Sequence, residues 1–179
     1  MEKEADGGTP QQKIAFLRSA RQVRRFQPDP VPDDVLHDIV EVARWSGSAS
    51  NQQPWDLVLV RRRETLQALA RSEGYAGHLA GAAAGLVLVM AGQDAETETF
   101  DEGRLSERII LAAKAHGVGG GIGWIRGGGQ DTVKRLLGIP ADRFIRTLIA
   151  LGYPADAPAR GRSGAGRKPL ADLVHEEHF

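Results

Sequence analysis

Short apolar runs of strand length alternate along the chain with segments of helical periodicity. Trp55–Val60 and Gly85–Met90 are almost wholly apolar and rich in β-forming residues, which predicts two buried strands. Shorter runs predict two more strands, at Ile122–Ile125 and Ile145–Leu151. Helices interleaved with buried strands favour an α/β or α+β layer architecture.

Five helices are predicted around these strands. Thr9 and Pro10 are an N-cap and first-turn signal for a helix that extends to about Ser19. A second helix starts at residues 31–34 and stops before Gly47, and the others are expected at 64–72, 105–116 and 132–137. The sequence has no G-x-G-x-x-G fingerprint and no Gly-Lys dipeptide, so it predicts neither a dinucleotide-binding turn nor a P-loop.

The length of 179 residues suits one domain. We expect a flexible N-terminus at residues 1–9 and a single domain at 10–179, in which residues 153–179 form an extended C-terminal arm. From Gly152 onward the chain is rich in Pro, Ala, Gly and Arg, which is typical either of a disordered tail or of an arm ordered by packing elsewhere. The apolar residues that return between Leu170 and Phe179 favour the arm.

Composition excludes several classes of function. Lys plus Arg and Asp plus Glu both number 23, so the formal net charge is zero and neither nucleic acid nor an anionic membrane is an expected partner. The absence of Cys removes disulfides, thiolate nucleophiles and Cys-based metal sites. No secretory signal and no apolar stretch of about 20 residues is present, so we expect a soluble, cytoplasmic protein.

Two polar segments are candidates for ligand binding. Arg18, Arg21, Arg24 and Arg25 place four guanidinium groups within eight residues, and such groups bind phosphate oxygens well, although a solvated basic face has the same pattern. The segment Ser46–Trp55 presents hydroxyls, amides and backbone N–H groups just before a strand, which suits a planar polar ligand but is also typical of an ordinary connection.

A third candidate is the glycine-rich segment Gly117–Ile125. Five of its first seven residues are Gly, within a chain that contains 22 glycines in all. Glycine loses much conformational entropy on folding, so this run indicates that something lies flat against the main chain.

These segments, in this order, carry signatures of a known family. The resemblance extends from about Phe16 to Phe179, and the Ser46–Trp55 element is its most specific part. Seven elements match: Ala20–Phe26, Asp29–Pro32, Ser46–Trp55, Leu111–Trp124, Leu137–Pro140, Leu151–Pro154 and Arg167–Leu170. The chain resembles the nitroreductase family of flavin enzymes.

The resemblance implies an α+β fold: three α/β/α layers around a mainly antiparallel central sheet, with the C-terminal arm exchanged in a homodimer. It further implies FMN at each end of the shared interface, NADH or NADPH as electron donor, and a small-molecule acceptor such as a nitroaromatic or a quinone. The flavin N5 would carry the hydride, so no catalytic side chain is named. Two alternatives stay open: a flavin-binding or flavin-sensing protein without useful turnover, and a flavin enzyme of this fold that performs dehalogenation or flavin fragmentation. Relatives with that other chemistry carry longer lids than Tyr75–Leu79 and Gln93–Gly103 allow here.

By the same resemblance, cofactor-binding residues are expected in four segments of the chain. Arg21 and Gln22 would approach the flavin phosphate, Arg24 the pyrimidine edge of the ring, and Arg167 with Lys168 would close on the phosphate. The remaining expected contacts come from the polar segment, usually that of the partner subunit, and from the glycine-rich strand: Ser48, Ala49, Ser50, Asn51, Gln53, Gly119, Gly120, Gly121, Ile122 and Gly123. Gln22 replaces the family's usual hydroxyl residue and Gly47 its usual proline.

Other residues receive structural assignments. His175 and His178 are three residues apart, whereas a zincin motif needs four, so no metal site is expected. His78 is interpreted as a surface residue. Trp45, Trp55 and Trp124 are interpreted as core residues, with Trp124 near enough to the glycine-rich run to touch a bound ring.

Overall fold

A four-stranded antiparallel sheet organises the chain. The computed structural model describes residues 7–156 and 166–179. Its strands are β1 (Trp55–Val60), β2 (Ala84–Met90), β3 (Gly119–Trp124) and β4 (Phe144–Gly152), in the order β1-β2-β4-β3. Each neighbouring pair is antiparallel, which confirms the expected sheet.

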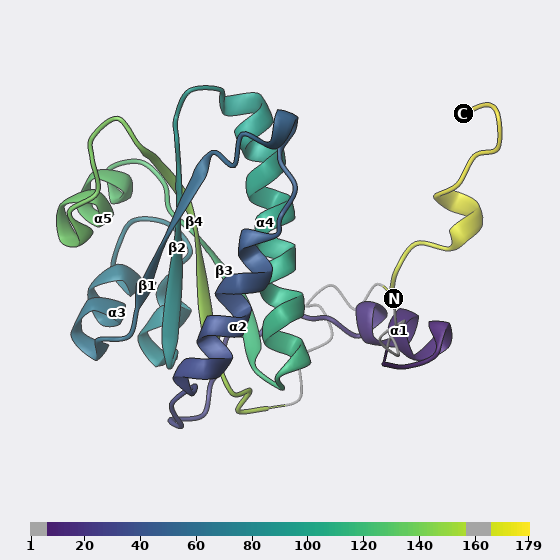
Figure 1. Ribbon diagram of the computed structural model, residues 1–179, viewed down its shortest axis with the longest axis horizontal. Helices are drawn as coiled ribbons and strands as arrows, with labels where there is room; N and C mark the ends of the chain where they lie inside the picture. Colours follow the sequence, from purple (N-terminus) through teal and green to yellow (C-terminus); the bar gives the residue numbers. More distant parts are fainter. Residues whose placement is uncertain (1–6, 157–165) are drawn as a thin grey trace, which may run out of the picture.

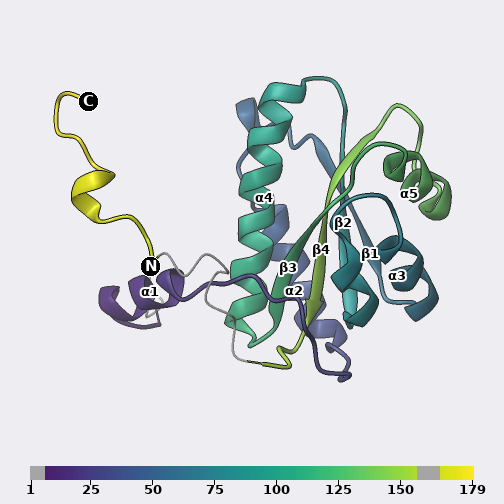
Figure 2. The same cartoon turned by 180° about the vertical axis from the view of Figure 1, so that it is seen from behind.

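Helices cover both faces of the sheet. On one face lie α2 (Asp33–Arg44) and α4 (Ala95–Ala115), and on the other lie α3 (Arg63–Ala70), the 3₁₀ segment η2 (Gly77–Gly81) and α5 (Gly129–Leu137), as Figures 1 and 2 show. The described secondary structure also includes α1 (Pro10–Arg18) and two short 3₁₀ segments, η1 (Ala49–Asn51) and η3 (Leu170–Asp172). The molecule therefore has the three-layer α+β architecture expected from the sequence. No helix in the described parts of the chain is long and apolar enough to cross a membrane.

The continuous apolar run of β2 is explained by its position between β1 and β4, with helices on both faces of the sheet. Successive strand residues point to opposite faces, so Leu86 and Leu88 pack in the core beneath α2 and α4, whereas Val87 and Val89 pack beneath α3 and η2. All seven residues of β2 are buried. A strand covered by helices on both faces has no position at which a polar side chain would meet water.

Helix α4 begins ten residues earlier than the predicted start at Leu105. Asp94 caps it by accepting hydrogen bonds from the backbone N–H groups of Glu96 and Thr97. Most of the segment Gln93–Gly103 is thus helix. The apolar periodicity is absent there because this half of the helix buries Glu98, Asp101 and Glu102 rather than aliphatic side chains.

The glycine-rich run lies inside β3, which starts at Gly119 rather than at the predicted Ile122. Residues 21–26 run along this strand, and the Val23 N–H donates to the Gly120 carbonyl at 2.9 Å. A Cβ atom on Gly121 would lie 2.1 Å from the Val23 carbonyl oxygen, and one on Gly119 would lie 2.7 Å from the Val23 side chain. What lies flat against this main chain is therefore another segment of the same protein.

The chain ends are less embedded than the sheet and its helices. Helix α1 buries no residue, and its Phe16 ring meets the Lys114 ammonium at 5.0 Å. Residues 153–155 pair with residues 25–27, but 166–179 are exposed throughout and lie away from the sheet in both views (Figures 1 and 2). The expected flexible terminus at 1–9 lies mostly outside the described residues. The division into one domain and an arm stays a prediction.

Two glycine substitutions test the close packing at β3. Gly121→Ala places a methyl group against the Val23 backbone, so we expect it to lower the free energy of unfolding by about 1–3 kcal/mol or more. Gly103→Ala in the middle of α4 meets nothing within 4 Å and should raise that free energy by about 1 kcal/mol. Urea unfolding monitored by circular dichroism measures both. Equal effects of the two substitutions would contradict the packing described for β3.

Candidate functional site

An open hollow lies at the β3 edge of the sheet. Its volume is about 710 Å³, within the range of small-molecule sites. Two polar side chains from the segment beside β3, residues of β3 itself and residues around η2 form the wall: Gln22, Arg24, Tyr75, Gly77, His78, Ile122 and Trp124. Amide, guanidinium, imidazole and aromatic groups therefore meet in one place.

The extended segment next to β3 positions Gln22 and Arg24. Alternate residues of extended backbone point to opposite sides, so burial of Val23 leaves its two neighbours facing the hollow. The Gln22 Oε1 atom accepts a hydrogen bond from the Ile122 N–H at 2.7 Å. This bond ties the amide to the strand and uses only the acceptor side of the side chain.

The other arginines of the basic cluster have different positions. Arg21 donates to the carbonyl oxygens of Arg18 and Ala20 at the end of α1. Arg25 forms an exposed ion pair with Asp156 at 3.1 Å. Of the four arginines, Arg24 alone contributes to the wall of the hollow as described.

Tyr75 and His78 were missed as site residues. The Tyr75 N–H donates to the Trp124 carbonyl at 2.6 Å, which holds the two residues side by side. His78 is half-buried, and its Nε2 donates to the Gly121 carbonyl at 3.1 Å, so its interpretation as a surface residue is wrong. Burial lowers the pKa of His78, and the nearby Arg24 charge lowers it further, against the opposing effect of the Gly121 hydrogen bond. No sequence pattern marked these two residues, because only the fold brings residues 75–78 to β3.

The polar segment before β1 has a strained backbone. Ser50, Asn51 and Gln53 have φ values of 48°, 57° and 50°, a left-handed conformation that non-Gly residues adopt at a free-energy cost. The Ser48 hydroxyl accepts from the Gln53 N–H at 2.8 Å, and the Ala49 N–H donates to the buried Asp101 carboxylate at 3.1 Å. Such strain, held by specific hydrogen bonds, is typical of a binding loop.

This loop does not reach the hollow at β3. It leads into β1, at the opposite edge of the sheet, and there Gln52 and Gln53 line a second hollow with a volume of about 660 Å³. Strands β2 and β4 lie between the two edges, a separation of roughly 14 Å at ordinary strand spacing. Within one chain the predicted site is therefore divided into two halves.

The two departures from the family pattern have local explanations. A Cβ atom on Gly47 would lie 2.1 Å from a guanidinium nitrogen of Arg104, which itself pairs with Asp101. The Arg104 side chain thus occupies the space that a proline ring at position 47 would need. Gln22 uses its longer amide to reach the Ile122 N–H, a bond across two segments.

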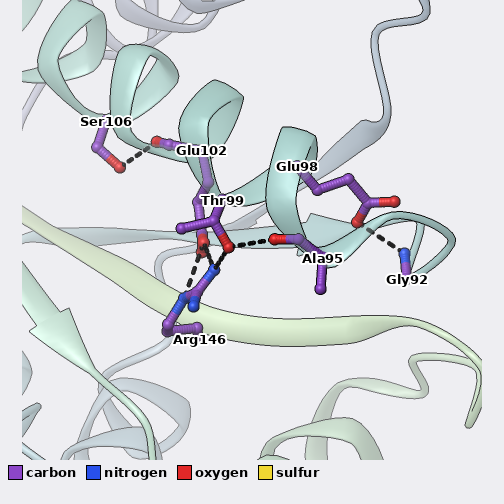
Figure 3. Close-up of polar contacts among 7 residues, drawn as sticks. All are labelled: Gly92, Ala95, Glu98, Thr99, Glu102, Ser106 and Arg146. Atoms are coloured by element: carbon purple, nitrogen blue, oxygen red, sulfur yellow. Dashed lines mark hydrogen bonds and ion pairs between the residues drawn. The ribbon is translucent and has the colours of Figure 1, made fainter.

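Buried carboxylates of α4 connect the sheet to its loops, as Figure 3 shows. The Glu98 carboxylate accepts from the N–H groups of Gly92, Gln93 and Asp94 at 2.8–3.1 Å. Glu102 accepts two hydrogen bonds from Arg146 of β4, at 3.0 and 2.7 Å, and the Thr99 hydroxyl accepts a third. The Arg146 guanidinium also lies 5.2 Å from the centre of the Trp124 ring, so this network extends to the wall of the hollow.

The remaining residues predicted from the sequence do not line the β3 hollow. Arg167 and Lys168 are exposed, and the wall of the β3 hollow does not include them among the described residues. Gly119, Gly120, Gly121 and Gly123 lie in β3 beside it. Trp45 is 67% exposed, with its indole N–H donating to Glu41, so its interpretation as a core residue is wrong.

Comparisons with known proteins relate the chain to a family and a fold. The Nitroreductase family model matches residues 17–74. An NADH dehydrogenase of Thermus thermophilus is 30% identical over 181 aligned residues, which cover 80% of this chain and 87% of that protein. An NADPH-flavin oxidoreductase of Vibrio harveyi is 26% identical, covering 93% of this chain and 74% of the relative. The structure of an FMN-dependent nitroreductase from Clostridium difficile superimposes with a TM-score of 0.81 at 21% identity and covers 93% of this chain and 99% of that one.

The chain therefore belongs to the nitroreductase family. Its fold is that of the structurally similar proteins, and the resemblance noted in the sequence is confirmed.

Removal of the Glu102 carboxylate tests the network behind Trp124. Glu102→Ala leaves the partly buried Arg146 charge without its carboxylate, so we expect it to lower the free energy of unfolding by about 1.5–3 kcal/mol. The double variant Glu102→Leu with Arg146→Met should lose less than this single one, because no unpaired charge stays buried. Asp56→Ala, which breaks the exposed pair with Arg143, is the control and should cost at most about 1 kcal/mol. A double variant that loses as much as Glu102→Ala would contradict this account.

Proposed function

We propose that this protein is an FMN-dependent oxidoreductase that passes a hydride from NADH or NADPH to an electron-poor acceptor, such as a nitroaromatic or a quinone. The observation that supports this most directly is the hollow at β3, in which Arg24, Gln22 and two aromatic rings meet in a chain of the nitroreductase family. Relatives named NADH dehydrogenase and NADPH-flavin oxidoreductase favour the same chemistry.

The residues present fit FMN. A flavin needs an aromatic or apolar surface for its ring, donors for its carbonyl edge and cations for its phosphate. The wall as formed by the described residues contains no carboxylate side chain and offers Trp124, Tyr75, the Gln22 amide and the Arg24 guanidinium. Neutral His78, held on the Gly121 carbonyl, adds no charge at neutral pH because its pKa is lowered. The donor set therefore suits a planar, anionic ligand.

Each group of predicted residues has a role in this proposal. Arg24 would stabilise negative charge that develops on the reduced ring, and Arg21, Gln22, Arg167 and Lys168 would bind the phosphate. Since Gln22 uses Oε1 for Ile122, its amide N–H groups face the ligand as donors. When bound, FMN supplies hydride transfer at its N5 atom. Protons for the acceptor can come from water, so we assign no acid.

A homodimer would join the two halves of the site. Ser48–Gln53 lie at the β1 edge and the hollow at the β3 edge of the same sheet, so a second copy is the simplest source of the loop. Apolar side chains are exposed on the two least embedded segments: Ile14, Leu17, Leu170, Leu173, Val174 and Phe179. Exposed apolar side chains of this kind favour an interface between copies of this chain, with the C-terminal arm exchanged.

Arg24→Ala tests the flavin assignment. Loss of the guanidinium should weaken FMN binding about 10- to 150-fold and slow reduction by NADPH, because a charge-assisted interaction of about 1.5–3 kcal/mol is removed. Absorbance titration with FMN and anaerobic stopped-flow reduction measure the two effects. Arg25→Ala is the matched control: it removes the same group one residue away, from an exposed ion pair, and should leave both values unchanged.

The outcomes separate the candidate functions. Unchanged affinity and reduction in Arg24→Ala would contradict the role of Arg24. A wild-type protein that binds FMN but is not reduced by either nicotinamide would favour a flavin-sensing protein. Reduction by NADPH with turnover of a quinone excludes the sensor.

Complementation between subunits tests the shared site. Arg24→Ala and Asn51→Asp should each weaken FMN binding. If one site takes Arg24 from one subunit and Asn51 from the other, mixed dimers of the two variants regain one intact site, or about a quarter of all sites after random exchange. FMN content after denaturation, mixing and refolding measures the recovery.

A mixture of Arg24→Ala with Gln22→Ala is the control, since both changes fall in the same half and no mixed dimer has an intact site. Light scattering that gives a monomer, or equal recovery in the two mixtures, would contradict the shared site.

A further inference from the structure

Two exposed aromatic residues with paired backbones contribute to the wall of the β3 hollow. Tyr75 is 66% exposed and Trp124 is 38% exposed, although both line the same wall. The hydrogen bond from the Tyr75 N–H to the Trp124 carbonyl and the bridge between Gly74 and Ile125 hold them in register. Large aromatic side chains so placed offer a stacking surface for another planar ring.

An arginine guanidinium lies over each ring, but only one of the two arginines is paired with a carboxylate among the described residues. Arg146 lies 5.2 Å from the Trp124 ring centre and is neutralised by the buried Glu102. Arg126 lies 5.0 Å from the Tyr75 ring centre and is exposed. Within residues 7–156 and 166–179, no carboxylate oxygen lies within 4.0 Å of the Arg126 guanidinium.

The acidic residue next to Arg126 in the fold, Glu73, directs its carboxylate to a backbone N–H group. The Glu73 carboxylate accepts a hydrogen bond from the Gly128 N–H at 3.1 Å, and its backbone carbonyl accepts from the Arg126 N–H at 3.0 Å. This arrangement holds the backbone of Arg126 in place while the Glu73 carboxylate is used by the Gly127–Gly128 turn. The Arg126 guanidinium is exposed beside the Tyr75 ring and forms no ion pair in the described chain, so it can contact a ligand that stacks there.

We propose that Tyr75 and Arg126 select acceptors in which an aromatic ring carries an anionic group, a carboxylate or a sulfonate. The ring of such an acceptor would stack at the exposed aromatic surface while its anionic group meets the Arg126 guanidinium, whose planar fork matches these oxygens. Arg24 is already assigned to the flavin, so Arg126 is the cation left for this purpose. The inference rests on the proposed function, because it names the substrate class of that same site.

The test compares naphthoquinone with naphthoquinone sulfonate, which share one ring system and differ by a fixed negative charge. The measured quantity is the ratio of kcat/KM for the sulfonate to that for the neutral quinone, at saturating NADPH. Arg126→Ala should lower this ratio about two- to fivefold relative to wild type, and Arg126→Glu should lower it about fourfold or more, since the site is exposed. Arg126→Lys should keep most of the ratio, and added salt should reduce the wild-type preference.

Arg135→Ala is the matched control, because it removes the same charge from the exposed surface of α5 and should leave the ratio unchanged. A second readout needs no turnover: calorimetric binding of naphthalene sulfonate and of naphthol to the holoprotein. Arg126→Ala should weaken the first and spare the second.

Unchanged ratios in both Arg126→Ala and Arg126→Glu, or a change confined to the KM for NADPH, would overturn this inference and leave the proposed function standing. A wild-type protein that holds no flavin, or turns over neither quinone, would overturn the proposed function and this inference with it.

Discussion

The close approach of residues 21–26 to β3 is the contact on which the candidate site depends. It requires that β3 present almost no side chain toward this segment, and Gly119 and Gly121 meet that requirement. The Val23 N–H then bonds to the Gly120 carbonyl, and the edge of the sheet is covered instead of exposed. The same contact turns Gln22 and Arg24 toward the hollow, so the packing of the sheet edge and the chemistry of the site have one cause.

The buried acidic residues of α4, which covers one face of the sheet, also position residues of the two sheet edges. A buried carboxylate needs a cation or hydrogen-bond donors beside it, and here these come from separate parts of the chain. Glu98 binds the turn after β2, Asp101 binds the loop before β1, and Glu102 binds Arg146 of β4. One helix thereby orients the strained loop at one edge of the sheet and, through Arg146, the Trp124 ring at the other.

Sequence patterns predicted the layers well because those layers depend on apolar burial. The run Gly85–Met90 indicated a strand buried on both faces, and the structure shows one. The first half of α4 was missed because its buried face is acidic, which a pattern of apolar residues cannot reveal. Tyr75 and His78 were missed for another reason: they come next to Trp124 and Gly121 only through the antiparallel bridge between Gly74 and Ile125. The basic and polar segments were recognised, but no spacing along the chain told Arg24, at the hollow, from Arg25, in an ion pair with Asp156.

The zero net charge of the chain conceals a local asymmetry. An overall balance of 23 basic and 23 acidic residues gives no long-range attraction for a polyanion. Fields between exposed charges decay over about 8 Å at physiological ionic strength, so a small ligand responds to the few charges next to it. At the β3 hollow Glu102 is paired with Arg146, whereas Arg24 and Arg126 have no carboxylate within 4.0 Å in the described chain. A protein that is neutral as a whole can therefore hold a positive site for small anions, because no carboxylate of the described chain forms an ion pair with Arg24 or Arg126.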